Sequence, residues 1–327
     1  MPEEIAKGLY RIPVPLPGNP LRELNAYLIY GKDRCLLVDT GFRQDACRRA
    51  LFAQLGELGL KAGDVDVLLT HLHSDHAGLA PEAAGERGTI YISAVDRPSL
   101  DGTASQRAAR WAEVTERFYS EGFPPEILEE LERTNPARTM APPEGGRYES
   151  LSDGQVLEAG GFRLQALLMP GHTPGQMCFW IEKEGLMLLG DHVLFDITPN
   201  ITAWPEMPDA LGAYLDSLTR IRAYAPVRGL PGHRGGGDLA ARVDALQEHH
   251  RLRLEETFRL VRQYPGTGAY ELAGHMTWRI RARNWAEFPA PQKWFAVGEC
   301  MSHLDHLMVQ GRIACREENG RRCYEAV

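Results

Sequence analysis

The sequence predicts an α/β protein in which helices pack outside a sheet. Short apolar, β-branched runs such as residues 65–70 and 89–92 alternate with stretches such as residues 44–58, whose apolar side chains recur at helical spacing. At 327 residues, of which 43% are hydrophobic, the chain is long enough for a large core and for one to two domains. An alternation of strands and helices is typical of sheets that are covered by helices.

The chain is predicted to begin with strands. Three runs before the first helix have strand character: residues 9–14, 24–30 and 35–41. A turn at residues 31–34 separates the second run from the third. In the helix that follows, over residues 44–58, Gly56 and Gly59 mark the point where the helical pattern ends.

Four side chains of metal-ligand type lie within six residues, directly after the strand predicted at residues 65–70: His71, His73, Asp75 and His76. His71 and His73 can lie on the same side of an extended backbone, while Asp75 and His76 turn with the following loop. Imidazole and carboxylate are preferred ligands of borderline divalent cations. The alternative is a solvated loop that happens to contain histidine. Because the chain has only 11 histidines, this clustering favours a cation site.

Three later segments repeat the same construction, in which a ligand-type side chain stands beside glycine or proline after an apolar run. They are Pro170–Gly175 with His172, Gly190–His192 with Asp191, and Pro231–His233 with His233. The preceding runs are residues 164–169, 186–189 and 227–230. Each ligand-type side chain is therefore expected at the end of a strand.

The pattern His-x-His-x-Asp-His after an apolar strand, with the three later segments in this order, resembles the metallo-β-lactamase superfamily of hydrolases. The resemblance covers roughly residues 8–235. It implies a four-layer αββα sandwich, in which strands within residues 151–194 form a second sheet that faces the first. His172, Asp191 and His233 would then converge with His71 along one edge of the sandwich.

The resemblance also implies two divalent metal ions, with zinc preferred and iron or manganese as alternatives. One ion would be held by His71, His73 and His172, the other by Asp75, His76 and His233, with Asp191 between them. A hydroxide that bridges the two ions would be the nucleophile. Because every implied ligand position is filled, a dinuclear site is favoured over the single iron of the sulfur dioxygenases. None of these positions is cysteine, unlike in the zinc β-lactamases that use one, which argues against antibiotic hydrolysis.

Three further residues receive roles from the resemblance. Asp75 would also orient the attacking water or carry its proton. His192 is either a support for the ligands or a proton donor to the leaving group, and the alternative is an outward-facing neighbour. Asp39, in an Asp-Thr-Gly turn, would support a ligating imidazole or its backbone; the alternative is that it caps the helix that begins near Gln44.

A helical insertion is predicted over residues 101–149, between the first ligand cluster and His172. Two helices are expected before a loop at residues 136–143. As a lid, the insertion would offer four aromatic side chains as a substrate wall: Trp111, Phe118, Tyr119 and Phe123. The alternative is that these side chains form the core of a helical hairpin packed on the sheet. Asn200, in a proline-interrupted segment after Asp191, is a further candidate for the pocket.

Helices are expected over about residues 208–223 and 239–261, and the catalytic domain is predicted to end near residue 263. Residues 264–327 are expected to form a separate small domain. Helical patterns at residues 270–278 and 289–310 are followed by a hairpin about Asn319-Gly320. Helices followed by a hairpin resemble a winged-helix module, which a subgroup of metallo-β-lactamase-like hydrolases carries at the C-terminus.

The charge distribution argues against a duplex reader, although a winged helix makes nucleic acid a candidate partner. The net charge is −8, and residues 240–327 hold 13 lysines and arginines against 11 aspartates and glutamates. Arg279, Arg281 and Arg283 are the compact basic group, whereas Glu299 and Asp305 lie on the helix that would have to enter a groove. We favour a module that packs beside the active site or mediates self-association into a homo-oligomer.

The cysteines and the N-terminus indicate a cytoplasmic protein without a membrane partner. The first residues are acidic and lack an apolar signal-like core, and no run approaches the roughly 18–20 apolar residues that span a bilayer. The six cysteines form neither CxxC pairs nor a dense disulfide scaffold. A two-residue turn at Asn319-Gly320 would pair Cys315 with Tyr324 and Cys323 with Arg316, which disfavours a disulfide between the two cysteines.

The favoured function is hydrolysis of a small ester, thioester or lactone, because the site resembles that of glyoxalase II and related enzymes. The acidic charge, the lack of a long basic strip beside the ligands and the aromatic insertion all favour a small, partly apolar substrate. One alternative is a phosphodiesterase or single-strand ribonuclease of the same fold. Another is a ligand-sensing regulator that binds nucleic acid through the C-terminal module.

Overall fold

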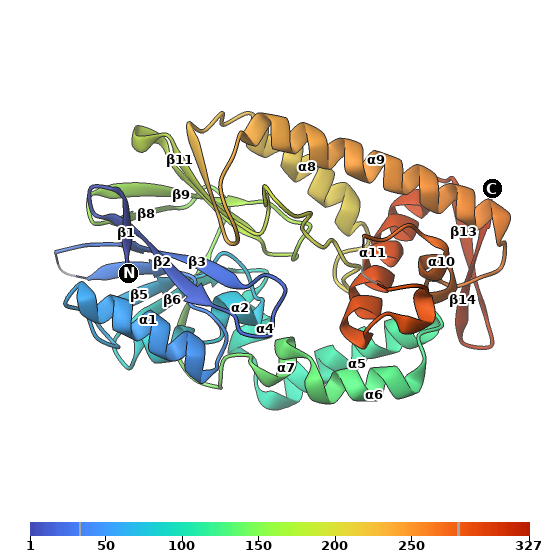
Figure 1. Cartoon of the computed structure of the whole chain (residues 1–327), viewed down its shortest axis with the longest axis horizontal. Helices are drawn as coiled ribbons and strands as arrows, with labels where there is room; N and C mark the ends of the chain where they lie inside the picture. Colours follow the sequence, from blue (N-terminus) through green and yellow to red (C-terminus); the bar gives the residue numbers. More distant parts are fainter. Residues whose placement is uncertain (33, 280–281) are drawn as a thin grey trace.

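The structure is a computed structural model that describes residues 1–32, 34–279 and 282–327. Two sheets face one another and helices cover their outer faces (Figure 1). Asp33 of the predicted turn and Arg281 of the predicted basic group lie outside the described residues. Within the described part of the chain, no helix combines the length and the apolar composition needed to cross a membrane.

The first sheet contains the predicted N-terminal strands. Its order is β1 (Glu3–Ala6), β2 (Leu9–Pro15), β3 (Glu23–Ile29), β4 (Cys35–Val38), β5 (Val65–Leu68), β6 (Thr89–Ser93) and β7 (Arg147–Leu151). The first four strands pair antiparallel, and β4 to β7 run parallel. Strands β1 and β7, which the sequence patterns do not predict, add one strand to each edge.

The second sheet has the order β12 (Arg228–Pro231), β11 (Leu186–Gly190), β10 (Met177–Ile181), β9 (Phe162–Leu168) and β8 (Val156–Ala159). β10 is antiparallel to both β9 and β11, and β11 is parallel to β12. β9, β11 and β12 therefore point in the same direction. Their carboxyl ends therefore lie at the same end of the sheet.

The layers follow from three apolar clusters. One cluster fills the space between the sheets, where Leu36 and Leu68 of the first sheet face Phe179 and Leu188 of the second. A second cluster joins the outer face of the first sheet to α1 (Asp45–Glu57) and α3 (Ala80–Ala84). The third joins the outer face of the second sheet to α8 (Ala210–Arg222) and α9 (Leu239–Gln263). The predicted four-layer αββα sandwich is confirmed.

The insertion after β6 is helical, as predicted. It contains α4 (Arg97–Asp101), α5 (Ala104–Ser120), α6 (Pro125–Thr134) and α7 (Pro136–Thr139), the last within the expected loop. Thr103 and Gln106 form a capping box that starts α5. Phe118 and Phe123 are fully buried, and the ring of Phe118 stacks on Trp294 with centroids 3.6 Å apart. The interpretation of these two side chains as a substrate wall is therefore wrong, because they form part of the core.

The C-terminal segment contains α10 (Ala269–His275), a 3-10 helix (Trp285–Glu287), α11 (Ala290–Val309), β13 (Ile313–Glu318) and β14 (Arg321–Ala326). The hairpin has the predicted register, with Cys315 opposite Tyr324 and Cys323 opposite Arg316. Its turn uses the left-handed conformation, with φ of 52° at Asn319 and 72° at Gly320. The six cysteines, all of them among the described residues, are free thiols.

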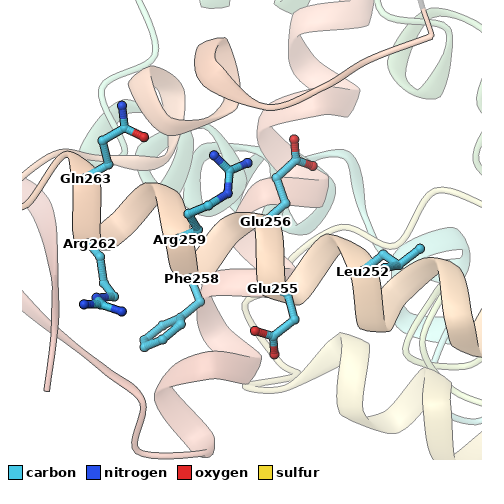
Figure 2. Close-up of a pocket in the computed structure, with 7 residues that line it drawn as sticks. All are labelled: Leu252, Glu255, Glu256, Phe258, Arg259, Arg262 and Gln263. Carbon is cyan, nitrogen blue, oxygen red and sulfur yellow. The ribbon is translucent and has the colours of Figure 1, made fainter.

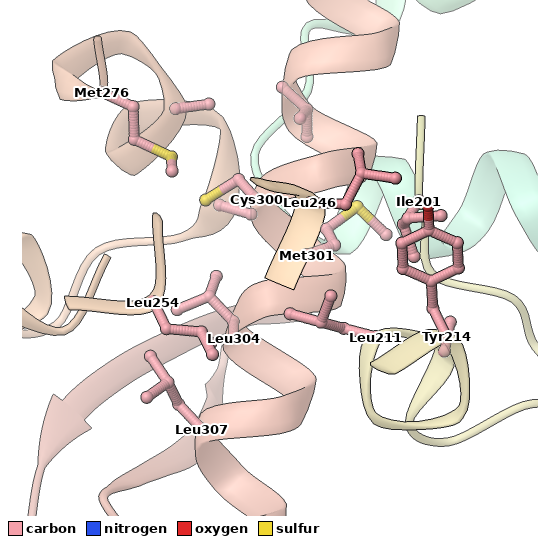
Figure 3. Packing of buried hydrophobic residues seen from close by; sticks show 14 of the residues in the cluster. Ile201, Leu211, Tyr214, Leu246, Leu254, Met276, Cys300, Met301, Leu304 and Leu307 are labelled. Carbon is pink, nitrogen blue, oxygen red and sulfur yellow. The ribbon is translucent and has the colours of Figure 1, made fainter. Parts of the chain in front are cut away.

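The C-terminal segment shares one apolar cluster with the rest of the chain. Figure 3 shows Met301 and Leu304 of α11 against Leu211 of α8 and Leu246 of α9. α11 also contacts α6 of the insertion, which lies below it in Figure 1. The boundary predicted near residue 263 coincides with the end of α9, but apolar packing continues across it.

Candidate metal centre

The ends of four strands bring the predicted ligand side chains together. His71 and His73 follow β5, and the short helix α2 (Ser74–Ala77) then places Asp75 and His76. The other three side chains follow β9, β11 and β12, respectively: His172, Asp191 and His233. Because Thr70 O accepts a 2.7 Å hydrogen bond from Met177 N at the start of β10, the loop after β5 is joined directly to the second sheet.

The donor atoms of these side chains form three overlapping groups, in each of which they lie within 4.8 Å of one another. One group is His71, His73 and His172; another is Asp75, His76 and His233; the third is His71, His76 and Asp191. Two sets of three ligands are thus linked through Asp191. The first two of these groups have the same members as the two ligand sets that the family resemblance implied.

The three-histidine group consists of His71, His73 and His172. In His71 and in His172, the Nδ1 atom makes a hydrogen bond to a neighbouring group, so that the Nε2 atom faces the other members of the group. His71 Nδ1 donates to Thr70 Oγ1 at 3.0 Å, and its Nε2 faces His73 Nδ1 at 3.0 Å. His172 Nδ1 donates to the carbonyl of Asn200 at 2.9 Å. Its buried Nε2 has no hydrogen-bond partner within the described structure. Such an arrangement fixes the tautomer that leaves the inward nitrogen free to bind a cation.

The second group (Asp75, His76 and His233) also has histidines whose Nδ1 atoms are hydrogen-bonded, and a carboxylate takes the place of the third histidine. His76 Nδ1 donates to Asp39 Oδ2 at 2.7 Å, and His233 Nδ1 donates to the carbonyl of Glu23 at 2.7 Å. The Nε2 atoms of His76 and His233 lie 3.3 Å apart, and Asp75 Oδ2 lies 3.3 Å from His233 Nε2. All three inward atoms therefore converge on one point.

Asp191 lies between the two groups. Its Oδ1 is 3.4 Å from His76 Nε2, and its Oδ2 is 3.5 Å from His233 Nε2 and 3.8 Å from His172 Nε2. Gly232 packs so closely that a Cβ there would lie 2.5 Å from Asp191 Oδ1. Asp191 Oδ1 has no hydrogen-bond donor among the described residues. A buried carboxylate in this position fits two divalent cations better than a protein-only network.

The pKa shifts differ between the two groups. Burial and the neighbouring histidines hold the pKa of His71 well below its usual value, and burial with His172 lowers the pKa of His73 to about 3. Burial alone would lower the pKa of His76, but the carboxylates of Asp39, Asp191 and Asp75 outweigh it and raise that pKa well above the ordinary value. Burial therefore favours the neutral form of the three-histidine group, in which the pKa of His172 is also lowered by burial, whereas the neighbouring carboxylates favour the protonated form of His76, whose proton a cation would displace.

Asp39 lies where the resemblance implied. Besides His76, it accepts hydrogen bonds from Thr70 N at 2.9 Å and Thr70 Oγ1 at 2.8 Å. Gln44, and not Asp39, occupies the N-cap position of α1, and its side chain makes no capping bond. The carboxylate of Asp39 thus supports His76 directly and His71 through Thr70. Its left-handed backbone, with φ of 58°, is a conformation that aspartate tolerates.

His192 is fully buried beside Asp191, but its ring lies against Tyr214 of α8, with centroids 5.4 Å apart. The Tyr214 hydroxyl donates to the His192 carbonyl at 2.9 Å. Both ring nitrogens lack a partner in the described structure, and burial lowers the pKa of His192 to about 3. The ring is therefore neutral, and it packs on α8 and belongs to none of the three groups of donor atoms, which is compatible with the outward-facing alternative.

The accessible side of the site lies beside His73, the half-buried member of the three-histidine group. Trp204, which the sequence patterns did not single out, stacks on His73 with centroids 6.1 Å apart. Its Nε1 donates to the His172 carbonyl at 3.3 Å. The guanidinium of Arg110, from the insertion, lies over the same indole at 5.8 Å from its centroid. These residues, rather than Phe118 or Phe123, border the ligands.

The remaining candidates for the pocket lie in different surroundings. Asn200 turns its side-chain amide to the carbonyl of Phe295 on α11, at 3.2 Å, while its own carbonyl orients His172. Trp111 is half-buried between Arg138 and Trp294. Tyr119 is exposed, and its ring lies under Arg321 of the hairpin. Asn200 thus joins the ligand loop to the C-terminal segment.

A surface hollow of about 710 Å³ lies elsewhere, along α9 (Figure 2). Its lining residues all come from one stretch of that helix and include Leu252, Phe258 and Arg259. None of the clustered histidines or aspartates lines it. The hollow and the candidate metal centre are therefore separate sites.

The chain matches known proteins over most of its length. A family model described as the metallo-beta-lactamase superfamily matches residues 20–233. The probable metallo-hydrolase YqjP of Bacillus subtilis is 28% identical over 93% of this chain and 92% of that protein. The lactamase-like protein adaB of Aspergillus niger is 27% identical over 84% and 72%, respectively. The atrochrysone carboxyl ACP thioesterase nsrC of Aspergillus novofumigatus is 26% identical over 71% of this chain and 55% of its own length.

Two solved structures are similar over the whole chain. A metallo-beta-lactamase family protein from Thermus thermophilus has a TM-score of 0.82 and 30% identity, covering 99% of this chain and 100% of that one. A beta-lactamase domain protein from Burkholderia ambifaria has a TM-score of 0.81 and 25% identity, covering 100% and 93%. Both matches include the C-terminal segment as well as the sandwich.

Proposed function

This chain belongs to the metallo-beta-lactamase superfamily of metallo-hydrolases, and from this premise we propose that it hydrolyses a small thioester, ester or lactone at a dinuclear metal site. The observation that carries the proposal is Asp191, which lies between two sets of convergent ligands. Zinc is the proposed metal, with iron or manganese as alternatives, because imidazole and carboxylate ligands suit all three.

In this proposal His71, His73 and His172 hold one ion, and Asp75, His76 and His233 hold the other. Two bound cations would polarise the scissile carbonyl and lower the pKa of a water toward 7. The chain's own contribution is to orient the ligands and exclude bulk water. The inward nitrogens are fixed by partners on the opposite side of each ring, namely Thr70, Asn200, Asp39 and Glu23.

Asp75 is proposed to orient the attacking water and to accept its proton. Burial alone would raise its pKa, but His76 and His233 override that effect and lower the pKa to about 2. The carboxylate is therefore ionised and able to accept a hydrogen bond at neutral pH. His192 is the other candidate for proton donor to the leaving group, but its ring is neutral and packs on Tyr214. The proton that Asp75 would take from the water is therefore the one available to the leaving group.

The side of the site that solvent can reach supports a partly apolar acyl substrate. Trp204 stacks on His73 at this side and offers a flat apolar surface next to the ligands. The overall charge of −8 does not favour a polyanionic substrate. One similar protein, nsrC of Aspergillus novofumigatus, is named as a thioesterase that acts on an acyl carrier protein. We therefore place thioesters first among the candidate substrates.

A paired rate assay tests the proposal. Zinc-loaded protein is assayed with S-lactoylglutathione and with bis(p-nitrophenyl) phosphate, each against a His71→Ala control. Faster cleavage of the thioester that depends on His71 is the expected result. Faster cleavage of the diester would instead favour the phosphodiesterase or ribonuclease alternative. Tight, salt-sensitive binding of duplex DNA without turnover of either substrate would favour the regulator alternative.

A further inference from the structure

We propose that Asp96 is a positioning residue that holds together the two loops carrying His71, His73 and His172, and thereby controls cation binding by the three-histidine group. The inference rests on the metal-binding part of the proposed function and not on the identity of the substrate. Nothing in the sequence motifs assigns a role to this residue, which is the last residue of the turn between β6 and α4.

The carboxylate of Asp96 is the meeting point of both loops. Its Oδ2 accepts hydrogen bonds from Leu72 N at 3.0 Å and from Thr173 Oγ1 at 2.8 Å. Its Oδ1 accepts one from Gly175 N at 2.7 Å. Leu72 lies between His71 and His73, and Thr173 directly follows His172. Three donors from two ligand loops are therefore fixed by one side chain from a third segment.

The position of Asp96 does not follow from an ordinary structural role. It is the N-cap residue of α4, yet its side chain makes no capping hydrogen bond. Instead its own backbone N–H donates to Ser93 Oγ at 3.0 Å, and the carboxylate turns toward the ligand loops. At 1% exposure, the side chain is buried among these partners. Because the side chain makes no capping bond and accepts three hydrogen bonds from the two ligand loops, these three donors fix its position.

The loop around His172 is built to admit this carboxylate. A Cβ at residue 175 would lie 2.6 Å from Asp96 Oδ1, so only glycine permits the close approach. Thr173 is fully buried and directs its hydroxyl to the same carboxylate. Both neighbours are thus matched to an acceptor at residue 96.

Asp39 supplies a comparison on the other side of the site. It binds His76 Nδ1 directly and thereby supports the second group, while Asp96 contacts backbone and hydroxyl donors around the three-histidine group. Asp39 also reaches His71 through Thr70, so it serves both ligand sets, whereas Asp96 contacts only the loops around the three-histidine group. Loss of Asp96 is therefore expected to weaken binding at the three-histidine group alone.

The chemistry of the three donors requires an acceptor-only side chain. An asparagine at residue 96 has the same size, but its amide group would place N–H against at least one of the three donors. Burial raises the pKa of Asp96, while the hydrogen bonds from Thr173, Gly175 and Leu72 oppose that effect, with a resulting pKa of about 6. At neutral pH the group is therefore mainly the carboxylate that all three donors need.

The decisive experiment measures zinc binding in backgrounds that leave one ligand set intact. His233→Ala retains the three-histidine group, and His172→Ala retains the second group. Asp96→Asn is added to each, and the dissociation constant is measured by competition with a chromophoric chelator. We expect Asp96→Asn to weaken binding by about 10–100-fold in the His233→Ala background, as is typical for residues that orient ligands, and to leave it unchanged in the His172→Ala background.

Asp153→Asn is the matched control, because Asp153 also accepts a backbone hydrogen bond, from Leu168 N at 2.8 Å, but is exposed. It should alter neither constant. A loss of equal size in both backgrounds, or none in either, would overturn the proposal. If Asp96→Asn does not fold, Thr173→Val replaces it, since this change removes one donor and keeps the carboxylate; a smaller loss confined to the His233→Ala background is then expected.

A second readout requires neither metal nor turnover. In metal-free protein, Asp96→Asn should accelerate amide hydrogen exchange at Leu72 and Gly175, while the exchange rate at Leu168 stays unchanged. Unchanged exchange at both loops would contradict the proposal even if zinc binding changed. Failure of the wild type to cleave thioesters would leave both tests intact, whereas failure to bind zinc would refute the proposed metal site and leave the exchange rates to decide the role of Asp96.

Discussion

The phenol of Tyr324 donates a 2.7 Å hydrogen bond to Oε1 of Glu121, a carboxylate that lies 203 residues earlier in the chain. Both side chains are buried. Arg117 and Arg322 each pair with the same carboxylate at 3.0 Å, and Ala269 N donates to its other oxygen. The end of α5 and the C-terminal hairpin are thus held together by one buried ionic network, so the insertion and the C-terminal segment form a single structural unit.

Tyr324→Phe is expected to destabilise the protein. The change removes a hydrogen bond to a buried carboxylate without altering the ring, and such bonds contribute about 1.5–3 kcal/mol. Urea unfolding of both proteins, with unchanged m-values, measures the difference in the free energy of unfolding. Tyr30→Phe, at an exposed tyrosine, is the control and should have no effect. Equal stability of wild type and Tyr324→Phe would mean that the network contributes nothing at this point.

Removal of residues 264–327 is expected to abolish soluble, metal-binding protein. The truncation strips Met301 and Leu304 from the cluster they share with Leu211 and Leu246, and it leaves those apolar faces of α8 and α9 in water. It also removes Phe295, whose carbonyl anchors Asn200. Soluble yield and zinc content of the truncated chain measure the outcome. A soluble truncated protein with two equivalents of zinc would support an independent domain that ends near residue 263.

The candidate ligands could be predicted from local sequence, because His71, His73, Asp75 and His76 cluster after one apolar run, and the three later candidates each follow an apolar run and adjoin glycine. His172 and Asp191 are examples, since the strand before them and the turn after them are both visible in the local sequence. The hairpin register could also be predicted from local sequence, because Asn319-Gly320 has a strong preference for one turn type.

The parts that could not be predicted depend on partners distant in sequence. Asp96 itself stands in no motif, and its role is visible only through the donors that reach it from Leu72, Thr173 and Gly175 in two other segments. The burial of Phe118 depends on Trp294, whose position beside α5 requires the whole C-terminal fold. Strand β7 is a polar edge strand with little apolar alternation, so its sequence carries no strong signal.

Asp191→Asn is expected to lower bound zinc below two equivalents and to abolish hydrolysis while the fold is retained. The carboxylate faces His76, His172 and His233, and a neutral amide cannot serve both ligand sets. Metal analysis, circular dichroism and the thioester assay are the measurements. Asp196→Asn, at an exposed aspartate five residues later, is the control and should behave as wild type. Full activity of Asp191→Asn would show that this residue does not link the two ions.

Removal of metal is expected to lower the free energy of unfolding. A ligand that binds only the folded state contributes about 2.7 kcal/mol per site when its free concentration is a hundred times the dissociation constant. Thermal or urea unfolding with and without a chelator, at neutral pH, measures this difference. The same treatment of His71→Ala should have a smaller effect, because one ligand set is already incomplete. An identical stability of treated and untreated wild type would argue against a cation site.

The pH dependence of stability is expected to report the burial of Asp96. Its pKa is about 6 in the folded protein, against an ordinary value of 3.8, so the folded state holds the proton more tightly than the unfolded state does. The contribution of Asp96 to the free energy of unfolding is therefore at its full size below pH 3.8, and it declines as the pH rises toward 6. A shift of this size corresponds to about 3 kcal/mol.

Asp96→Asn cannot titrate at this position, so the difference in the free energy of unfolding between metal-free wild type and variant isolates the contribution of Asp96. The ligand histidines titrate in both proteins and largely cancel, and Arg110, a charged neighbour that acts on Asp96, keeps its charge throughout. Urea unfolding at a series of pH values should show the wild type losing stability relative to Asp96→Asn between the two pKa values and no further change above the upper one. A difference that stays constant across this window would mean that Asp96 has an ordinary pKa, and that its three hydrogen bonds compensate fully for its burial.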